Sequence, residues 1–105
     1  MKLSLKKQAI TKTIRTGRAV QSDIARAKIR KGEAGHTRIA VVVPKAVFKK
    51  AVDRNRAKRI FVEALRALEG RGGAIDMDIV VFPKQACAGK SSKDASRFLE
   101  RIMAV

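Results

Sequence analysis

The chain has 105 residues, 46% of them hydrophobic, which is enough for one folded domain with a modest core and too little for two domains. Twenty-five Lys and Arg against nine Asp and Glu give a net charge of +16, and such an excess repels itself unless a polyanion neutralises it. No run of about 18 apolar residues is present, which excludes a membrane span, and residues 1–7 contain no apolar stretch long enough for a secretion signal.

The positive charge favours nucleic acid as the partner. Cations that neutralise phosphates release counterions, which supplies affinity without sequence specificity. The chain has one cysteine, Cys87, so it can form no internal disulfide, and we expect a cytoplasmic location.

Residues 3–16 are predicted to form a helix that ends at Gly17. Residues 23–30 alternate between apolar and basic side chains, which is the pattern of a strand with one basic face. The basic face consists of Arg26, Lys28 and Arg30, and the apolar face consists of Ala25, Ala27 and Ile29. The pattern leaves open whether the basic face is simply solvated or binds RNA.

A loop with two glycines is expected at 31–37, followed by a strand at 38–43 that Pro44 ends. That strand, RIAVVV, is almost entirely apolar and rich in β-branched residues, so we predict that it is central in the sheet and buried on both faces. Residues 45–52 form a connection. It carries three lysines, Lys45, Lys49 and Lys50.

The strongest helix signal begins at Asp53, a suitable N-cap, and runs to residue 68 before a glycine-rich segment. Its apolar residues recur at three- and four-residue spacing. They are Ala57, Ile60, Phe61, Ala64 and Leu68, and the opposite face holds Asn55, Arg59 and Arg66. A buried strand follows at 78–82, then a polar loop at 84–92 and a final helix at 93–104. Strands interleaved with helices predict a two-layer α/β sandwich, in which only three strands are distinct from the sequence.

Residues 53–59, DRNRAKR, place four cations at the start of the strongest helix. The unpaired N–H groups there carry partial positive charge, which disfavours nearby cations. A phosphate-rich partner would offset that cost. The alternative interpretation is a solvated charge run, which is common on helices.

The segment RNRAKR at 54–59, following the strand RIAVVVPK at 38–45, resembles the RNR signature of the bacterial ribonuclease P protein family. The similarity extends to GHTRI at 35–39, MDIVV at 77–81 and RTGR at 15–18. The resemblance implies an α+β fold over residues 1–105, a two-layer α/β sandwich of order α-β-β-β-α-β-α with a left-handed β-α-β crossover. The same fold occurs in the second domain of a small-subunit ribosomal protein.

The resemblance also implies a function. In the family, an RNA subunit removes the 5′ leader of precursor tRNA by Mg²⁺-dependent hydrolysis, and the protein contributes no catalytic side chain. The implied contacts with the catalytic RNA are Arg54, Asn55, Arg56, Lys58, Arg59, Lys45, Lys49 and Lys50. The single-stranded leader is expected between the sheet and the first helix, at Arg26, Lys28, Ile14 and Phe48. The expected partners are the catalytic RNA and precursor tRNA, with no obligate protein partner and no metal ion held by the protein.

The chain departs from the family where aromatic side chains usually stack on leader bases. The matching residues are Ile10, Ile14 and Ala27, and the chain has no Tyr or Trp. Because stacking contributes about 1–3 kcal/mol per base, we expect leader binding to depend mainly on phosphate contacts. Phe48 is either an RNA contact or a core residue.

Two other classes of function compete with this prediction. A ribosomal or other structural RNA-binding protein would have the same size, charge and layering. A freestanding nuclease is disfavoured, because His36 and Cys87 have no neighbours that would complete a metal site or activate a thiol. Asp76 and Asp78 resemble a carboxylate pair for Mg²⁺, and we interpret Asp78 instead as the start of a strand.

Overall fold

The computed structural model describes residues 6–32, 38–68 and 77–103 of the chain. The elements in order are α1 (Lys7–Thr16), β1 (Arg18–Gln21), β2 (Ala25–Lys31), β3 (Arg38–Val41), α2 (Ala51–Leu68), β4 (Met77–Pro83), the 3₁₀ helix η1 (Gln85–Gly89) and α3 (Ser92–Met103). This order of helices and strands confirms the predicted α-β-β-β-α-β-α arrangement, and β1 is the strand that the sequence did not separate. None of the described helices is long and apolar enough to cross a membrane.

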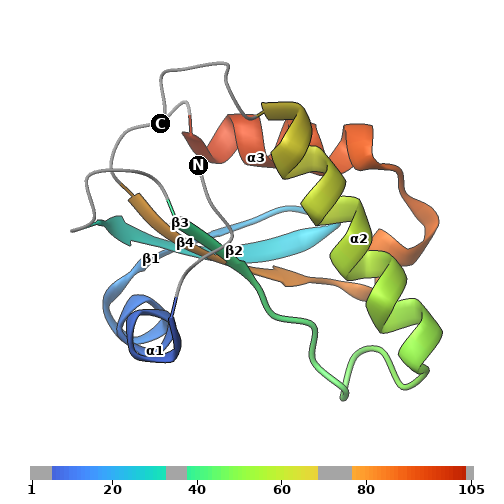
Figure 1. Cartoon of the computed structure of the whole chain (residues 1–105), viewed down its shortest axis with the longest axis horizontal. Helices are drawn as coiled ribbons and strands as arrows, with labels where there is room; N and C mark the ends of the chain where they lie inside the picture. Colours follow the sequence, from blue (N-terminus) through green and yellow to red (C-terminus); the bar gives the residue numbers. More distant parts are fainter. Residues whose placement is uncertain (1–5, 33–37, 69–76, 104–105) are drawn as a thin grey trace.

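The four strands form one mixed sheet in the order β1-β2-β4-β3. β2 is antiparallel to both of its neighbours, and β3 is parallel to β4, so the chain crosses over between β3 and β4 through α2. Figure 1 shows α2 and α3 on one face of the sheet and α1 against the other face. The handedness of the crossover stays a prediction of the family resemblance.

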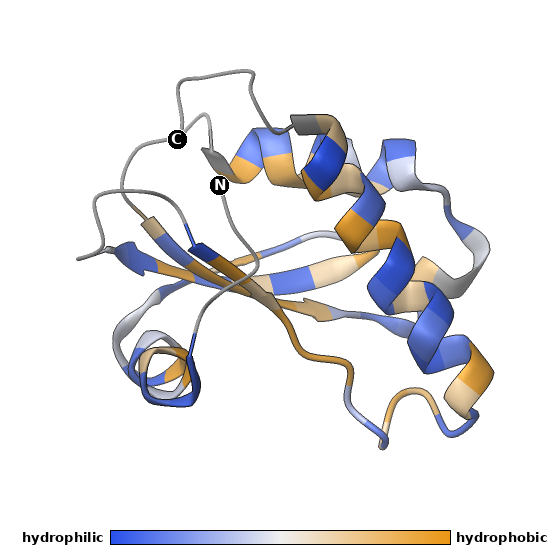
Figure 2. Ribbon diagram, viewed as in Figure 1, coloured by the Kyte–Doolittle hydropathy of each residue, from blue (hydrophilic) through white to orange (hydrophobic). Residues whose placement is uncertain are grey.

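The main core lies between the sheet and the helices α2 and α3. The apolar face of β2 is buried as predicted, and it shares the core with Ile79 and Val81 of β4. The rings of Phe61 on α2 and Phe98 on α3 meet edge to face, with 6.3 Å between their centroids, and join the two helices. Figure 2 shows how hydrophobic and hydrophilic residues alternate along these elements, as burial of one face requires.

The prediction of a central strand at 38–43 is wrong. β3 lies at the edge of the sheet, and of its four residues only Ile39 is fully buried. The central strand is β4, in which Ile79, Val80 and Val81 are completely buried. The apolar run of residues 38–43 suggested a central strand because it continues past the end of β3. Beyond the strand, the Val42 N–H still donates to the carbonyl oxygen of Val81, and Val43 packs against the core.

Helix boundaries differ from the prediction at α2. The helix begins at Ala51, so Asp53 lies inside the first turn and is not the N-cap. Its carboxylate still lies where the helix dipole favours negative charge. The glycine-rich segment after α2, residues 3–5 of the predicted first helix and the 33–37 part of the predicted loop lie outside the described residues.

Gly17 ends α1 as predicted, for a reason that the sequence does not show. Its φ of −76° is ordinary, so no left-handed conformation is involved. A side chain there would place its Cβ 2.4 Å from the carbonyl oxygen of Thr13 and 3.0 Å from that of Ile29. The glycine therefore permits the close approach of the helix end to β2.

The prediction of a polar loop at 84–92 is wrong. This segment contains η1, and it buries Cys87 completely. Burial raises the pKa of the Cys87 thiol, and the negative charge of Asp94 raises it further. At the start of α3, Asp94 accepts hydrogen bonds from the backbone N–H and the hydroxyl of Ser91, and these lower the pKa of Asp94. Cys87 is thus a core residue with an unreactive thiol.

A buried ion pair lies at one end of the sheet. The carboxylate of Asp78 on β4 is completely buried, and Arg38 of β3 binds it through two hydrogen bonds of 3.0 and 2.9 Å. Arg30 of β2 approaches the same carboxylate from the other side, with its Nε 3.6 Å from Oδ2. Asp78 therefore joins three strands, and its carboxylate is neutralised by two arginines instead of being available for a cation.

We expect Asp78→Asn to lower the free energy of unfolding by about 3 kcal/mol, because it removes the buried negative charge that two largely buried guanidinium groups share. Urea denaturation would measure this change. The matched control is Glu63→Gln, the same change at an exposed position of α2, which should alter stability by no more than about 0.5 kcal/mol. Equal effects of the two substitutions would contradict the structural role of Asp78.

Candidate RNA interface

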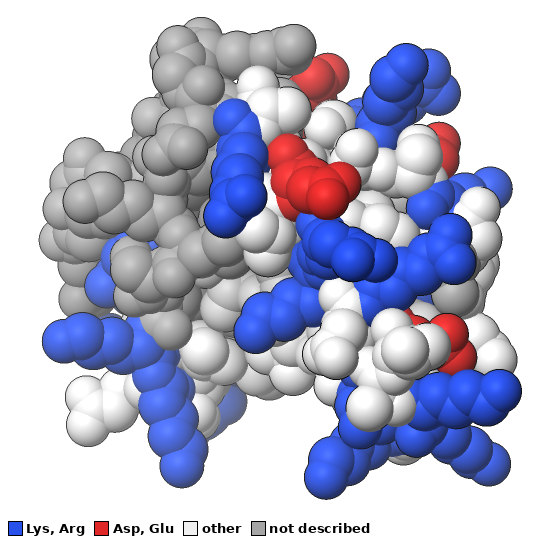
Figure 3. Space-filling model, turned by 45° about the vertical axis from the view of Figure 1, so that its right-hand side comes forward, with Lys and Arg blue, Asp and Glu red and all other residues white. Residues whose placement is uncertain are grey.

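The outer face of α2 carries most of the predicted RNA-binding residues. The inner face is fixed by five buried residues, Ala57, Ile60, Phe61, Ala64 and Leu65. Since successive side chains of a helix are about 100° apart, this packing directs the polar residues between them toward solvent. The exposed residues are Asn55, Arg56, Lys58 and Arg59. Figure 3 shows Lys and Arg side chains spread over this side of the molecule, with acidic side chains among them.

The connection from β3 to α2 adds Lys45, Lys49 and Lys50, all of which are exposed. A hollow of about 440 Å³ opens beside them, between the connection, the start of α2 and η1. Lys49 and Lys50 line it together with Asp53 and Gln85. The N–H groups of Asp53 and Arg54 donate to the carbonyl oxygen of Lys50, so what the hollow offers an anion is the charge of two lysines, partly offset by the carboxylate of Asp53.

Arg54 differs from the other cations of this segment. It is half-buried, and its Nη1 donates hydrogen bonds to the carbonyl oxygens of Phe48 at 2.8 Å and Lys49 at 3.1 Å. The protein itself therefore satisfies this guanidinium, which fastens the connection to α2. With the helix starting at Ala51, Arg56 and Arg59 also lie beyond the first turn, where the dipole no longer disfavours them. The expectation that the helix dipole demands a phosphate at these arginines is corrected accordingly.

The structure brings together only some of the residues of the predicted leader site. Arg26 is exposed and Lys28 is half-buried, and alternation along β2 places both on the sheet face that α1 packs against. Ile14 of α1 is 38% exposed. Phe48, in contrast, is 3% exposed and packs in the main core, so it is a core residue and leaves the candidate site. Ala27 also faces that core.

Sequence analysis missed one residue on this sheet face, Phe82 of β4. It is half-buried and pairs in register with Arg26, whose guanidinium carbon lies 5.4 Å from the centre of the Phe82 ring. A signal was present in the alternation of 77–83, which puts Phe82 and Asp78 on the same side of β4. We interpreted the whole strand as buried and therefore overlooked it.

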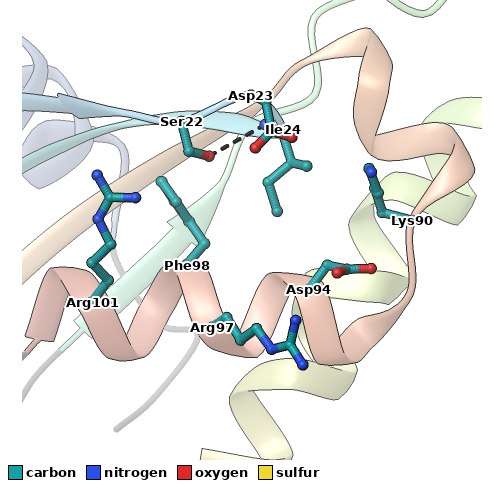
Figure 4. A pocket seen from close by; sticks show the side chains of 8 residues that line it. All are labelled: Ser22, Asp23, Ile24, Lys90, Asp94, Arg97, Phe98 and Arg101. Atoms are coloured by element: carbon teal, nitrogen blue, oxygen red, sulfur yellow. Dashed lines mark hydrogen bonds between the residues drawn. The ribbon is translucent and has the colours of Figure 1, made fainter.

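A second hollow lies on the opposite side of the sheet, between the β1–β2 turn and α3 (Figure 4). Its volume is about 190 Å³, smaller than most ligand sites. Ile24 and Phe98 form its apolar part, and its charged residues carry both signs: Lys90, Arg97, Arg101, Asp23 and Asp94. This mixture does not favour a polyanion in the way that the α2 face does.

The model of the Ribonuclease P family matches residues 2–105. The chain belongs to the ribonuclease P protein family. It is 34% identical over 79 residues to the ribonuclease P protein component of Halorhodospira halophila, covering 75% of this chain and 63% of that protein. It is 39% identical over 75 residues to the component of Idiomarina loihiensis, covering 69% of this chain and 58% of that protein. The matched region thus spans less than two thirds of these curated relatives.

Solved ribonuclease P proteins share the fold. The structure of the Staphylococcus aureus protein matches with a TM-score of 0.77 and 20% identity, covering 98% of this chain and 92% of that chain. The Thermotoga maritima protein matches with a TM-score of 0.76 and 22% identity, covering 98% and 94%. Within the ribonuclease P protein fold, the RNR segment of this chain thus divides into Arg54, which binds backbone carbonyls, and Asn55 and Arg56, which are exposed.

Arg54→Ala should lower the free energy of unfolding by about 1.5 kcal/mol or more, because two carbonyl groups lose a charged donor. Arg59→Ala, which removes an exposed cation from the same helix, should leave stability within about 0.5 kcal/mol of the unchanged protein. Urea unfolding of both variants would measure the difference. If Arg54→Ala were as stable as Arg59→Ala, the carbonyl contacts would not hold the connection in place.

Proposed function

We propose that this chain is the protein subunit of ribonuclease P, a ribonucleoprotein endoribonuclease that removes the 5′ leader of precursor tRNA in the cytoplasm. The protein binds the catalytic RNA through Arg56, Lys58, Arg59 and the lysines of the β3–α2 connection. The sheet face with Arg26 and Lys28 binds the leader. The RNA subunit carries out the hydrolysis with Mg²⁺, and the protein contributes no catalytic side chain.

The observation that carries the proposal is the group of exposed cations on the connection and α2, in a chain of this family. The apolar packing of α2 holds its cations outward on a rigid helix, so they can meet phosphates without reorganising. Charge of this kind supplies affinity and orientation but not base identity, which suits a protein that positions a folded RNA.

The competing functions have less support. A ribosomal role would use the same charge and layering, but family membership favours ribonuclease P. A freestanding nuclease would need acidic or imidazole groups free for chemistry. The carboxylate of Asp78 is engaged by two arginines, and Asp94 is engaged by Ser91.

Reconstitution tests the proposal directly. At low Mg²⁺, the purified protein together with ribonuclease P RNA should cleave precursor tRNA efficiently, and neither component alone should do so. Gel analysis of the 5′ cleavage products measures this. Cleavage by the protein alone would support the nuclease alternative, and a protein that gives the RNA no gain in cleavage would contradict the proposed function.

Arg56→Ala with Arg59→Ala should weaken assembly with the catalytic RNA and reduce the log–log salt dependence of binding by about one unit per lost phosphate contact. Both side chains are exposed, so circular dichroism should be unchanged. The matched control is Lys93→Ala with Arg97→Ala, which removes the same charge from the exposed side of α3. If both double variants change RNA affinity equally, net charge rather than the α2 face controls binding.

A further inference from the structure

The hollow beside the β3–α2 connection contains a carboxylate that a pure phosphate site would not need. Its volume of about 440 Å³ is within the range of ligand sites, and Lys49, Lys50, Asp53 and Gln85 supply its polar side chains. Two lysines attract an anion, but Asp53 repels it, so a site for phosphate alone would be better without the carboxylate. The combination suits a ligand that carries hydrogen-bond donors as well as a phosphate.

The carboxylate of Asp53 is available to such a ligand. It is half-buried, and it has no hydrogen bond or ion pair within the described part of the structure, although Lys49 and Lys50 line the same hollow. The neighbouring Arg54 donates to backbone carbonyl oxygens instead. The dipole of α2 stabilises a negative charge in the first turn without using its acceptors, so both oxygens of Asp53 remain able to accept hydrogen bonds.

An apolar wall adds a different kind of contact to the hollow. Val47 is one of three large hydrophobic residues that are exposed in the described part of the chain, at 37%, and it lines the hollow together with Ala46. The flat face of a nucleobase is apolar, whereas its edges carry hydrogen-bonding groups. The hollow therefore offers a contact for the face, the edge and the phosphate of one nucleotide.

Hydrogen bonds within the protein hold the walls of the hollow in place. The N–H groups of Val47 and Phe48 both donate to the carbonyl oxygen of Pro44, at 3.2 and 3.1 Å. Arg54 ties the carbonyl oxygens of Phe48 and Lys49 to α2, and the Phe48 side chain is anchored in the main core. Because the backbone of the connection is already ordered, binding there costs little conformational entropy.

A carboxylate at this place distinguishes between the bases. An ionised Asp only accepts hydrogen bonds. Guanine presents two neighbouring donors on its Watson–Crick edge, N1–H and N2–H, which match the two oxygens of a carboxylate. Adenine and cytosine have an acceptor nitrogen beside their amino group, and uracil has its single N–H between two carbonyl oxygens. Each of these three bases would therefore set an acceptor against an oxygen of Asp53.

We propose that this hollow binds one unpaired guanosine of the ribonuclease P RNA. Asp53 accepts from N1–H and N2–H of the base, and the amide of Gln85 on η1 donates to its O6. Val47 contacts the face of the base, and Lys49 and Lys50 bind its phosphate. This inference rests on the proposed function, and it adds base recognition at one point to a surface whose other cations bind phosphates without reading the base.

The catalytic RNA is the ligand that the position of the hollow favours. The hollow adjoins the connection and the start of α2, whose exposed cations are proposed to bind that RNA. The guanosine has to be unpaired, because pairing would occupy the edge that Asp53 recognises.

Asp53→Asn tests the proposal by the sign of its effect. If the surface acted through charge alone, removing a negative charge would strengthen RNA binding. We expect instead that affinity for ribonuclease P RNA falls about tenfold, because guanine loses a charged acceptor and meets an amide donor. Filter binding at fixed salt measures this change. The matched control is Glu63→Gln, which removes an exposed carboxylate from the same helix and should leave affinity equal or slightly higher.

Gln85→Ala tests the same site without changing α2. Its side chain is exposed, so the fold should be unaffected, and affinity for ribonuclease P RNA should fall about fivefold through the loss of one hydrogen bond. If circular dichroism shows that Asp53→Asn unfolds the protein, the affinity of Gln85→Ala decides the outcome.

Inosine substitution locates the guanosine. Inosine keeps N1–H and O6 and lacks the N2 amino group. Ribonuclease P RNA is transcribed with phosphorothioate-tagged inosine at scattered guanosine positions, the RNA that binds the protein is separated, and iodine cleavage maps the positions at which inosine prevents binding. One unpaired position should interfere with the unchanged protein, and this interference should disappear with Asp53→Asn.

The proposal is overturned if folded Asp53→Asn binds ribonuclease P RNA as tightly as the unchanged protein or more tightly, or if no inosine position distinguishes the two proteins. A loss of affinity for precursor tRNA alone would also overturn it, since the guanosine would then belong to the substrate. In each of these cases the unchanged protein still binds ribonuclease P RNA, and the proposed function stands. Failure of the unchanged protein to bind that RNA would instead contradict the proposed function.

Discussion

The buried carboxylate of Asp78 determines how this sheet carries its charge. It draws Arg38 from β3 and Arg30 from β2 onto the central strand, and so fastens the edge strand to the rest of the sheet. A buried carboxylate of this kind is costly to desolvate and persists only when its partners satisfy it. The consequence is a division along one sheet face. At its far end Arg30 and Arg38 share the carboxylate of Asp78, and its other end carries Arg26 and Lys28, the cations of the proposed leader site.

The cations of α2 are also divided into those bound within the protein and those exposed to solvent. A count of cations in the sequence is therefore a poor guide to an RNA surface. Arg54 lies within the basic segment, yet it binds two backbone carbonyls and holds the connection against the helix. Arg56, Lys58 and Arg59 follow within five residues and are exposed. A cation that fastens the fold and the exposed cations proposed to contact RNA are therefore neighbours in the sequence, and only packing distinguishes them.

Alternation and helical spacing in the sequence were sufficient for the apolar face of β2 and for four of the five buried residues of α2, but they missed Leu65. The predicted inner residue Leu68 has a side chain outside the described part of the structure, and the stop of α1 followed from Gly17 itself. They failed where a long-range contact decides the outcome. β1 has no buried residue among its four, so no pattern marks it. The start of α2 moves to Ala51, where Arg54 and the carbonyls before the helix set the local geometry. For the candidate site, alternation placed Arg26 and Lys28 on one face, but it could not show that Phe82 lies beside Arg26.

The two proposed RNA surfaces lie on opposite sides of one sheet. α2 packs on the face that forms the main core (Figure 1), and the alternation of side chains along β2 and β4 places the Arg26–Phe82 pair on the other face. β4 separates them and is completely buried at three successive residues, so the distance between the surfaces is set by a rigid central strand and not by a loop. The function proposed above would use this rigidity to hold two RNA segments at a fixed separation. The protein's part in catalysis would then be geometric, because it would keep a single-stranded leader in place relative to a second, structured RNA on the other side of the sheet.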